Sequence, residues 1–124
     1  MIAAVVVWVL LAALAVFQMA LVAGAPLGRF AWGGGSPVLP TRLRVGSAVS
    51  VVIYAVIAWV VAGSVSLRSE PANDGGADLG IWILTAYFTL GVALNAASRS
   101  RPERIVMTPV ALLLAVCCLG IALA

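Results

Sequence analysis

The chain has 124 residues, of which 65% are hydrophobic and 9% are charged, and its net charge is +3. Soluble domains carry about one-quarter charged residues, so the composition excludes a protein whose main solvent is water. The sequence has no His and no Lys, which excludes His-ligated haem or zinc, His general-base catalysis, Ser-His-Asp triads and Schiff-base lysines.

The first apolar stretch runs from Met1 to Gly28 without a charged residue. A crossing needs about 20 apolar residues in a helix that satisfies its own backbone hydrogen bonds, so we predict a first span over residues 2–23. Ala23-Gly24-Ala25 resembles the cleavage site of a signal peptide. However, no positive charge precedes the apolar run, and the run is long for that role. A retained helix is therefore the favoured interpretation.

The segment that follows, residues 24–44, is rich in Gly and Pro and is also apolar. This composition does not favour a helix, and Phe30 and Trp32 are aromatic residues of the kind that lie at membrane interfaces. We predict a first loop that rests on the bilayer surface. Gly33-Gly34-Gly35-Ser36 is not a phosphate-binding P-loop, because no Lys follows it and no strand precedes it.

Three further stretches are free of charge and long enough to cross a bilayer. Together with the first, they predict an all-α four-helix transmembrane bundle that forms one domain over residues 1–124. Cys117 and Cys118 are adjacent in the last stretch, a spacing that strains a disulfide and provides half of a typical metal site. We interpret them as packing residues. The later spans are predicted over residues 45–65, 79–97 and 105–123.

The last span contains a proline that allows two starts for its helix. In the first interpretation Thr108 is the N-cap and Pro109 lies in the first turn. In the second, Ser100 and Glu103 form a capping box, and Pro109 lies inside the helix and kinks it. We favour the second interpretation, because the helix then has enough apolar length to cross.

The arginines predict how the helices are threaded. Six of the seven lie in the first and third loops, where Glu103 is the one acid, whereas the second loop contains Arg68 with Glu70, Asp74 and Asp78. Short loops rich in Arg stay on the cytoplasmic side. We therefore predict an N-out, C-out orientation, with the first and third loops in the cytoplasm and both termini outside.

Two amides, Gln18 and Asn95, lie inside predicted spans, and the predicted threading puts both near the cytoplasmic ends of their helices. Asn95 shares a helix face with Ser98 by three-residue spacing. Two interpretations remain open: the amides hydrogen-bond between helices, or they form with Ser98 a polar pocket that opens to the cytoplasm. No charged residue lies in the core of a span, which disfavours transport driven by an intramembrane carboxylate.

Arginines in the first and third loops form a second candidate site. An Arg at the membrane surface attracts anionic headgroups by about 1 kcal/mol, and its forked guanidinium also suits an acidic protein partner. Topology signals have the same pattern, so that interpretation stays open. The candidate surface for anionic lipid or a partner comprises Arg42, Arg44, Arg99, Arg101 and Arg104.

The larger aromatic residues suggest how deep each helix lies in the bilayer. Trp8 and Trp82 fall near the outer ends of their predicted spans, and with Trp32 of the first loop they are candidate interface anchors. Tyr54 and Tyr87 lie nearer mid-depth, where a hydroxyl needs a hydrogen-bond partner. The threonines of the third span are candidate partners.

Several motifs occur along the chain outside the second loop. They are Phe17-Gln18-x-Ala20-Leu21-x-Ala23-Gly24-Ala25-Pro26-Leu27-Gly28, Ala31-Trp32-Gly33-Gly34, Leu39-Pro40, Leu94-Asn95-x-x-Ser98-Arg99-Ser100-x-x-Glu103-Arg104 and Met107-Thr108-Pro109. Together they resemble an uncharacterised family of four-span integral membrane proteins of actinobacteria. The resemblance implies the architecture and a bacterial plasma membrane, and it implies no activity.

The favoured function is a non-enzymatic membrane protein whose cytoplasmic loops bind anionic lipid headgroups or a protein partner. The alternative is a small homodimeric transporter or channel with a path near Gln18 and Asn95. A lipid-modifying enzyme is disfavoured, because no nucleophile and base can be paired. We expect no catalytic residue, no cofactor, no metal site and no nucleic acid partner.

Overall fold

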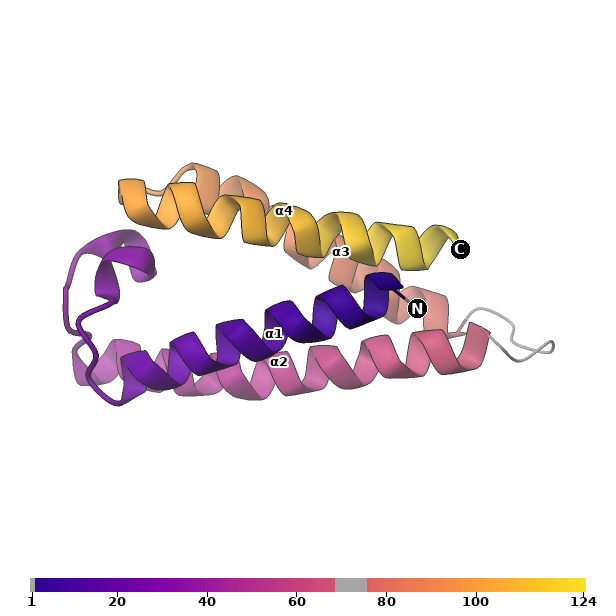
Figure 1. The fold of residues 1–124 in the computed structure, drawn as a ribbon, viewed down its shortest axis with the longest axis horizontal. Helices are drawn as coiled ribbons and strands as arrows, with labels where there is room; N and C mark the ends of the chain where they lie inside the picture. Colours follow the sequence, from indigo (N-terminus) through magenta and orange to yellow (C-terminus); the bar gives the residue numbers. More distant parts are fainter. Residues whose placement is uncertain (1, 69–75) are drawn as a thin grey trace.

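The computed structural model describes residues 2–68 and 76–124. In these residues four helices are long and apolar enough to cross a bilayer (Figure 1), which confirms the predicted all-α four-helix architecture. By length and composition the chain is a multi-pass membrane protein. The helices are α1 (Ile2–Val22), α2 (Thr41–Arg68), α3 (Gly76–Ala96) and α4 (Arg101–Leu123).

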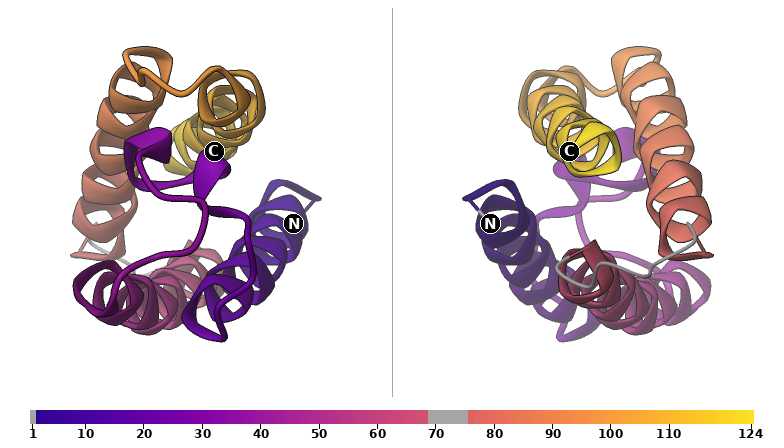
Figure 2. Two further views of the ribbon diagram at one scale, coloured as in Figure 1. Left: turned by 90° about the vertical axis from the view of Figure 1, so that its left-hand side faces the viewer. Right: turned by 90° about the vertical axis from the view of Figure 1, so that its right-hand side faces the viewer.

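The four helices are arranged as two pairs. α1 lies along α2 and α3 lies along α4, and these pairings are the most extensive contacts between helices. The pairs meet near the chain termini and diverge toward the opposite end (Figures 1 and 2). Between the diverging pairs lies loop one, residues 23–40, which contains two 3-10 turns, η1 (Gly28–Phe30) and η2 (Trp32–Gly34).

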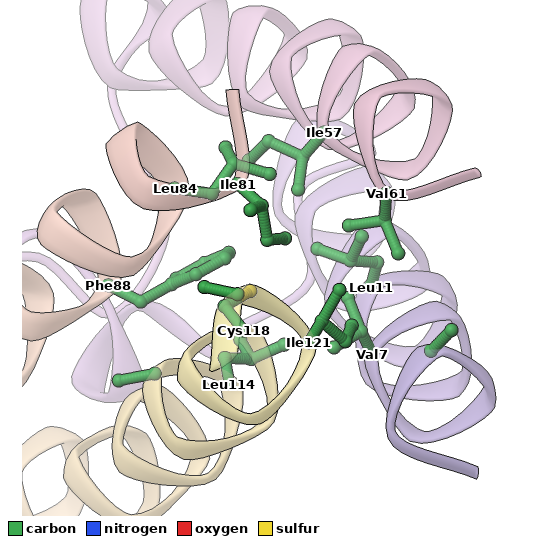
Figure 3. Close-up of a cluster of buried hydrophobic side chains, with 13 residues drawn as sticks. Val7, Leu11, Ile57, Val61, Ile81, Leu84, Phe88, Leu114, Cys118 and Ile121 are labelled. Carbon is green, nitrogen blue, oxygen red and sulfur yellow. The ribbon is translucent and has the colours of Figure 1, made fainter. Parts of the chain in front are cut away.

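The main hydrophobic core occupies the half of the bundle where the pairs meet, and all four helices contribute to it (Figure 3). Inside a bilayer such a core holds by close packing, because lipid tails are as apolar as the side chains themselves. Cys118 packs in this core. The labelled core residues are Val7, Leu11, Ile57, Val61, Ile81, Leu84, Phe88, Leu114, Cys118 and Ile121.

A glycine ends the first helix and turns the chain into loop one. Gly24 follows the end of α1 with a φ of +94°. The Ala25 N–H donates to the Ala20 carbonyl at 3.0 Å, so the end of α1 is a Schellman motif, in which Gly adopts the left-handed conformation without a Cβ penalty. The chain is thereby directed back between the helix pairs.

The last helix begins where the second interpretation of the sequence predicts. Ser100 is the N-cap of α4, and its Oγ accepts a hydrogen bond from the Glu103 N–H at 3.5 Å. Pro102 lies in the first turn and Pro109 lies inside the helix. Thr108 is therefore a residue of the helix interior and not its cap.

Loop one and loop three, residues 97–100, lie at the same end of the bundle, and the two chain termini lie at the other end (Figure 1). We call the former the arginine end, because six of the seven arginines belong to its loops and to the helix starts beside them. Of the predicted acidic second loop, Glu70 and Asp74 lie outside the described residues, whereas Arg68 is the last residue of α2 and Asp78 belongs to the first turn of α3.

Candidate functional site

Loop one folds back on itself and lies between the helix pairs at the arginine end (Figure 2). The Gly28 N–H donates to the Pro37 carbonyl at 2.9 Å. The two passes of the loop approach so closely that a Cβ on Gly28 would lie 1.7 Å from the Ser36 carbonyl oxygen. Only glycine fits at this crossing. Beneath it, Leu21, Ala31 and Leu39 form a small second core.

Trp32 attaches loop one to α2. Its indole Nε1 donates to the Oγ of buried Ser47 at 3.1 Å, and its ring lies against Gly46, where a Cβ would meet ring atoms at 2.8 Å. Trp32 has a φ of +52°, a left-handed conformation that non-glycine residues rarely adopt. The packing of the ring and the indole hydrogen bond therefore hold a locally unfavourable backbone.

Three contacts attach the same loop to α4. The Ser100 Oγ donates to the Arg29 carbonyl, and the Gly33 N–H donates to Oε2 of Glu103 at 3.0 Å. Gly34 approaches Ser100 so closely that a Cβ would lie 2.5 Å from the Ser100 Cβ. Loop one thus joins the start of α4 to α2 across the arginine end (Figure 2).

Glu103 is the unexpected residue of this end, because its carboxylate faces inward and the side chain is only 9% exposed. Besides Gly33, the Ser98 Oγ donates to Oε2 at 2.5 Å. Both donors are neutral. The reciprocal half of the predicted capping box is absent, since the Ser100 N–H donates to the Ser98 Oγ at 3.1 Å and not to Glu103.

A cavity of about 310 Å³ lies under loop one, between the diverging helix pairs. Residues of all four helices and of loop one line it. Glu103 is the one charged residue among the described lining residues. The polar and aromatic lining consists of Phe17, Gln18, Phe30, Trp32, Ser50, Tyr54, Tyr87, Phe88, Asn95 and Glu103.

The two predicted amides both line this cavity, although they come from different helix pairs. Gln18 is 9% exposed, its Nε2 lies 3.3 Å from the Tyr54 hydroxyl, and its Oε1 is buried without a hydrogen-bond partner. Asn95 donates through Nδ2 to the Gly91 carbonyl of its own helix at 2.7 Å. Ser98 does not line the cavity and reaches it only through its bond to Glu103.

Tyrosine partners differ from those expected. Tyr54 contacts Gln18 and not a threonine, whereas Thr85 and Thr89 donate to backbone carbonyls of α3 at 2.8 and 2.7 Å. The threonine hydroxyls are the shorter groups, and a carbonyl one turn earlier lies within their reach. Tyr87 packs edge-on against Phe88, with ring centroids 5.2 Å apart.

The predicted arginine surface divides into two groups at the same end, one at the start of α2 and one at the start of α4, with loop one between them (Figure 2). Arg44 is half-buried and donates through Nε to the Leu39 carbonyl at 2.9 Å, so it also supports loop one. Arg104 donates to the Ser98 carbonyl at 3.0 Å. The exposed members are Arg42, Arg99, Arg101 and Arg104.

The tryptophans predicted as interface anchors have different surroundings. Trp8 is partly buried against the core, and its Nε1 donates to the Ala58 carbonyl of α2 at 3.2 Å. Trp82 is an exposed residue of α3, and Trp32 is the docking residue of loop one. Trp59, on α2, is 76% exposed.

Sequence reasoning missed the inward carboxylate of Glu103 and the docking of loop one. The run Gly33-Gly34-Gly35 was the available signal, because Gly33 and Gly34 adopt positive φ and Gly34 approaches Ser100 closely. The aromatic lining was also missed, since its members come from loop one and from three different helices.

Comparison with known proteins gave no match: no family model, no curated protein and no solved structure is similar to this chain. In residues 2–68 and 76–124, no three His, Cys, Asp or Glu side chains gather that could hold a metal ion.

Proposed function

We propose that this protein is a non-enzymatic integral membrane protein whose arginine end binds anionic lipid headgroups on the cytoplasmic side of a bacterial plasma membrane. The supporting observation is the burial of Glu103. Its carboxylate is the one acidic group at this end, and it faces the cavity, whereas four of the five candidate arginines are exposed. The surface that meets the headgroups is then uniformly cationic.

The proposed orientation follows from the same charges. Arginine-rich short loops stay in the cytoplasm, where the inner leaflet carries anionic lipid that attracts basic residues near the surface. The N-out, C-out threading would therefore put the exposed arginines of α2 and α4 beside the leaflet with which they interact most favourably.

The experiment measures lipid binding by native mass spectrometry, with anionic and zwitterionic phospholipids of the same acyl chains. Wild-type protein should retain more anionic lipid. In Arg99→Gln/Arg101→Gln this preference should fall by roughly 5- to 30-fold, since each Arg contributes about 1 kcal/mol. Because the attraction is electrostatic, it should also weaken as salt shortens the Debye length from about 10 Å at 0.1 M to about 3 Å at 1 M.

Matched single variants supply the control. Arg101→Gln should weaken anionic lipid binding, whereas Arg68→Gln, the same change at the opposite end of the bundle, should leave it unchanged. Equal retention of anionic and zwitterionic lipid by the wild type would contradict the proposal. If the double variant instead loses a co-purifying acidic protein, the arginine end binds a protein partner and not lipid.

A second candidate function, a small homodimeric transporter or channel, is supported by the cavity. Gln18 and Asn95 line one space between the helix pairs, near the arginine end. A polar path inside a membrane bundle needs such groups on facing helices. In this function a second copy of the chain would complete the path.

A further inference from the structure

We infer that the cavity under loop one binds a small organic ammonium ion with an apolar body. This inference rests on the second candidate function, because the proposed transport path and the proposed ligand site use the same cavity. The experiment below measures binding and not transport, so ammonium binding and transport can fail independently. Four features of the cavity carry the inference: its single charge, its aromatic walls, its unsatisfied amide and its size.

The single charge comes from Glu103. A buried carboxylate is normally paired with a cation, because burying a charge without a partner is unfavourable. Here both donors, the Gly33 N–H and the Ser98 hydroxyl, are neutral and both reach Oε2. No group in the described part of the chain donates to Oε1, and no arginine lines the cavity. A ligand ammonium would supply the missing positive charge.

The walls suit a cation with an apolar body. Six aromatic residues line the cavity, and they come from loop one, α1, α2 and α3. The Phe30 ring already has the Arg29 guanidinium over it at 4.9 Å, so the other five are the rings left to contact a ligand cation. Aromatic faces attract ammonium groups through their quadrupole, most strongly where water is excluded. The rest of the lining is mainly aliphatic, with Leu14, Leu94 and Met107 among its members, and would contact the apolar part of the ligand.

The unsatisfied amide belongs to Gln18. Its Nε2 lies 3.3 Å from the Tyr54 hydroxyl, and its Oε1 is buried without a hydrogen-bond partner. A buried polar group without a partner is rare in folded proteins. With Oε1 free, as in the structure, the missing group is a donor. An ammonium N–H meets this requirement, and Asn95 offers its Oδ1 as a further acceptor because its Nδ2 is bonded to Gly91.

The volume limits the ligand. Small-molecule sites commonly measure about 300–1,000 Å³, and the cavity of about 310 Å³ lies at the lower bound. A molecule with one aromatic ring and a short amine chain suits that space, whereas a larger ligand would extend beyond the lining residues. A lipid acyl chain remains a competing occupant, and the experiment is designed to separate it from the ammonium ion.

The probes are 2-phenylethylammonium and 2-phenylethanol, which share one apolar body and differ in carrying an ammonium or a hydroxyl group. Each is titrated calorimetrically into the full protein in nanodiscs of zwitterionic lipid, and empty nanodiscs correct for partitioning. We expect the ammonium ion to bind about tenfold more tightly than the alcohol, as a charge-assisted contact gives over a neutral one. Equal affinities, as a site for acyl chains would give, or no binding of the ammonium ion, overturn the proposal.

Glu103→Gln then tests the source of the preference. Gln keeps the size of the side chain and an oxygen to accept from Gly33 and Ser98, but it removes the charge. The ammonium-to-alcohol ratio should fall to near one. Asp78→Asn, the same change at the start of α3 at the opposite end, should keep the wild-type ratio. A tenfold preference that survives in Glu103→Gln overturns the proposal.

A second variant covers the case in which Glu103→Gln does not fold, as judged by helical circular dichroism and a single size-exclusion peak. Gln18→Leu removes the unpartnered amide without touching the contacts of loop one. It should weaken binding of 2-phenylethylammonium by about threefold or more, the effect of one lost hydrogen bond. Unchanged affinity in Gln18→Leu overturns the assignment of the ammonium site to this cavity.

Discussion

Replacing Trp32 with Ala should loosen the docking of loop one on α2 without unfolding the helices. Trp32 is 46% exposed, so about half of the roughly 150–250 Å² of an aromatic side chain is buried. At about 25 cal/mol per Å² this burial contributes roughly 2.5 kcal/mol, and the bond to Ser47 adds about 1 kcal/mol. An undocked indole regains part of this free energy at the membrane interface. We therefore expect Trp32→Ala to reduce the free energy of loop-one docking by about 2 kcal/mol.

The assay is hydrogen–deuterium exchange of the backbone amides of residues 24–40, with the protein in nanodiscs. If the free energy of local opening falls by about 2 kcal/mol, the exchange rate of these amides rises by roughly 30-fold. Peptides from the core halves of the helices should exchange as in the wild type. Gly46→Val should give a similar increase from the opposite side, because its side chain occupies the place of the Trp32 ring.

Trp59→Ala is the matched control, because it is the same substitution at a tryptophan that is 76% exposed. It should leave exchange of residues 24–40 unchanged. If Trp32→Ala also leaves exchange of residues 24–40 unchanged, Trp32 does not hold loop one on α2.

Two further predictions concern threading and transport. In a chain lacking Cys117 and Cys118, a membrane-impermeant maleimide on intact cells should label Asn73→Cys, which lies outside the described residues. It should not label Val38→Cys in loop one. The reverse result would invert the predicted orientation. In proteoliposomes, Gln18→Leu/Asn95→Leu should abolish any saturable flux of organic ammonium ions. The double change should destabilise the fold by no more than about 2 kcal/mol. If the wild type shows no such flux, the transporter function is wrong.

The helices and their order could be predicted because one physical constraint determines them. Backbone groups inside a bilayer must bond within their own helix, so each long charge-free stretch has one possible structure. The start of α4 was predictable for a similar reason, since Ser100 and Pro102 are local signals that act within one turn. Helix starts and spans can be predicted because they depend on residues that are close together in the sequence.

The site was harder to predict because it depends on residues far apart in the chain. Glu103 reads as a capping residue, and its actual partner in loop one, Gly33, lies 70 residues earlier. Trp32 reads as an interface anchor, yet its ring needs the absence of a side chain at Gly46 to dock on α2. Gln18 and Asn95 could be predicted to lie at one depth, but not that the helix pairs diverge and leave a cavity between them.

The two proposals both depend on Glu103, and this makes them separable. Inward burial of its carboxylate takes the one negative charge of the arginine end away from the exposed surface and gives the cavity the one charge among its described lining residues. Lipid binding by the arginines needs only that the carboxylate be away from the surface, so neutralising it in Glu103→Gln should leave anionic lipid binding intact. Ammonium binding needs the charge itself, so Arg99→Gln/Arg101→Gln should leave it intact. A variant at either site that abolished both activities would show that loop one collapses as a unit, and the cavity and the surface would then be one site.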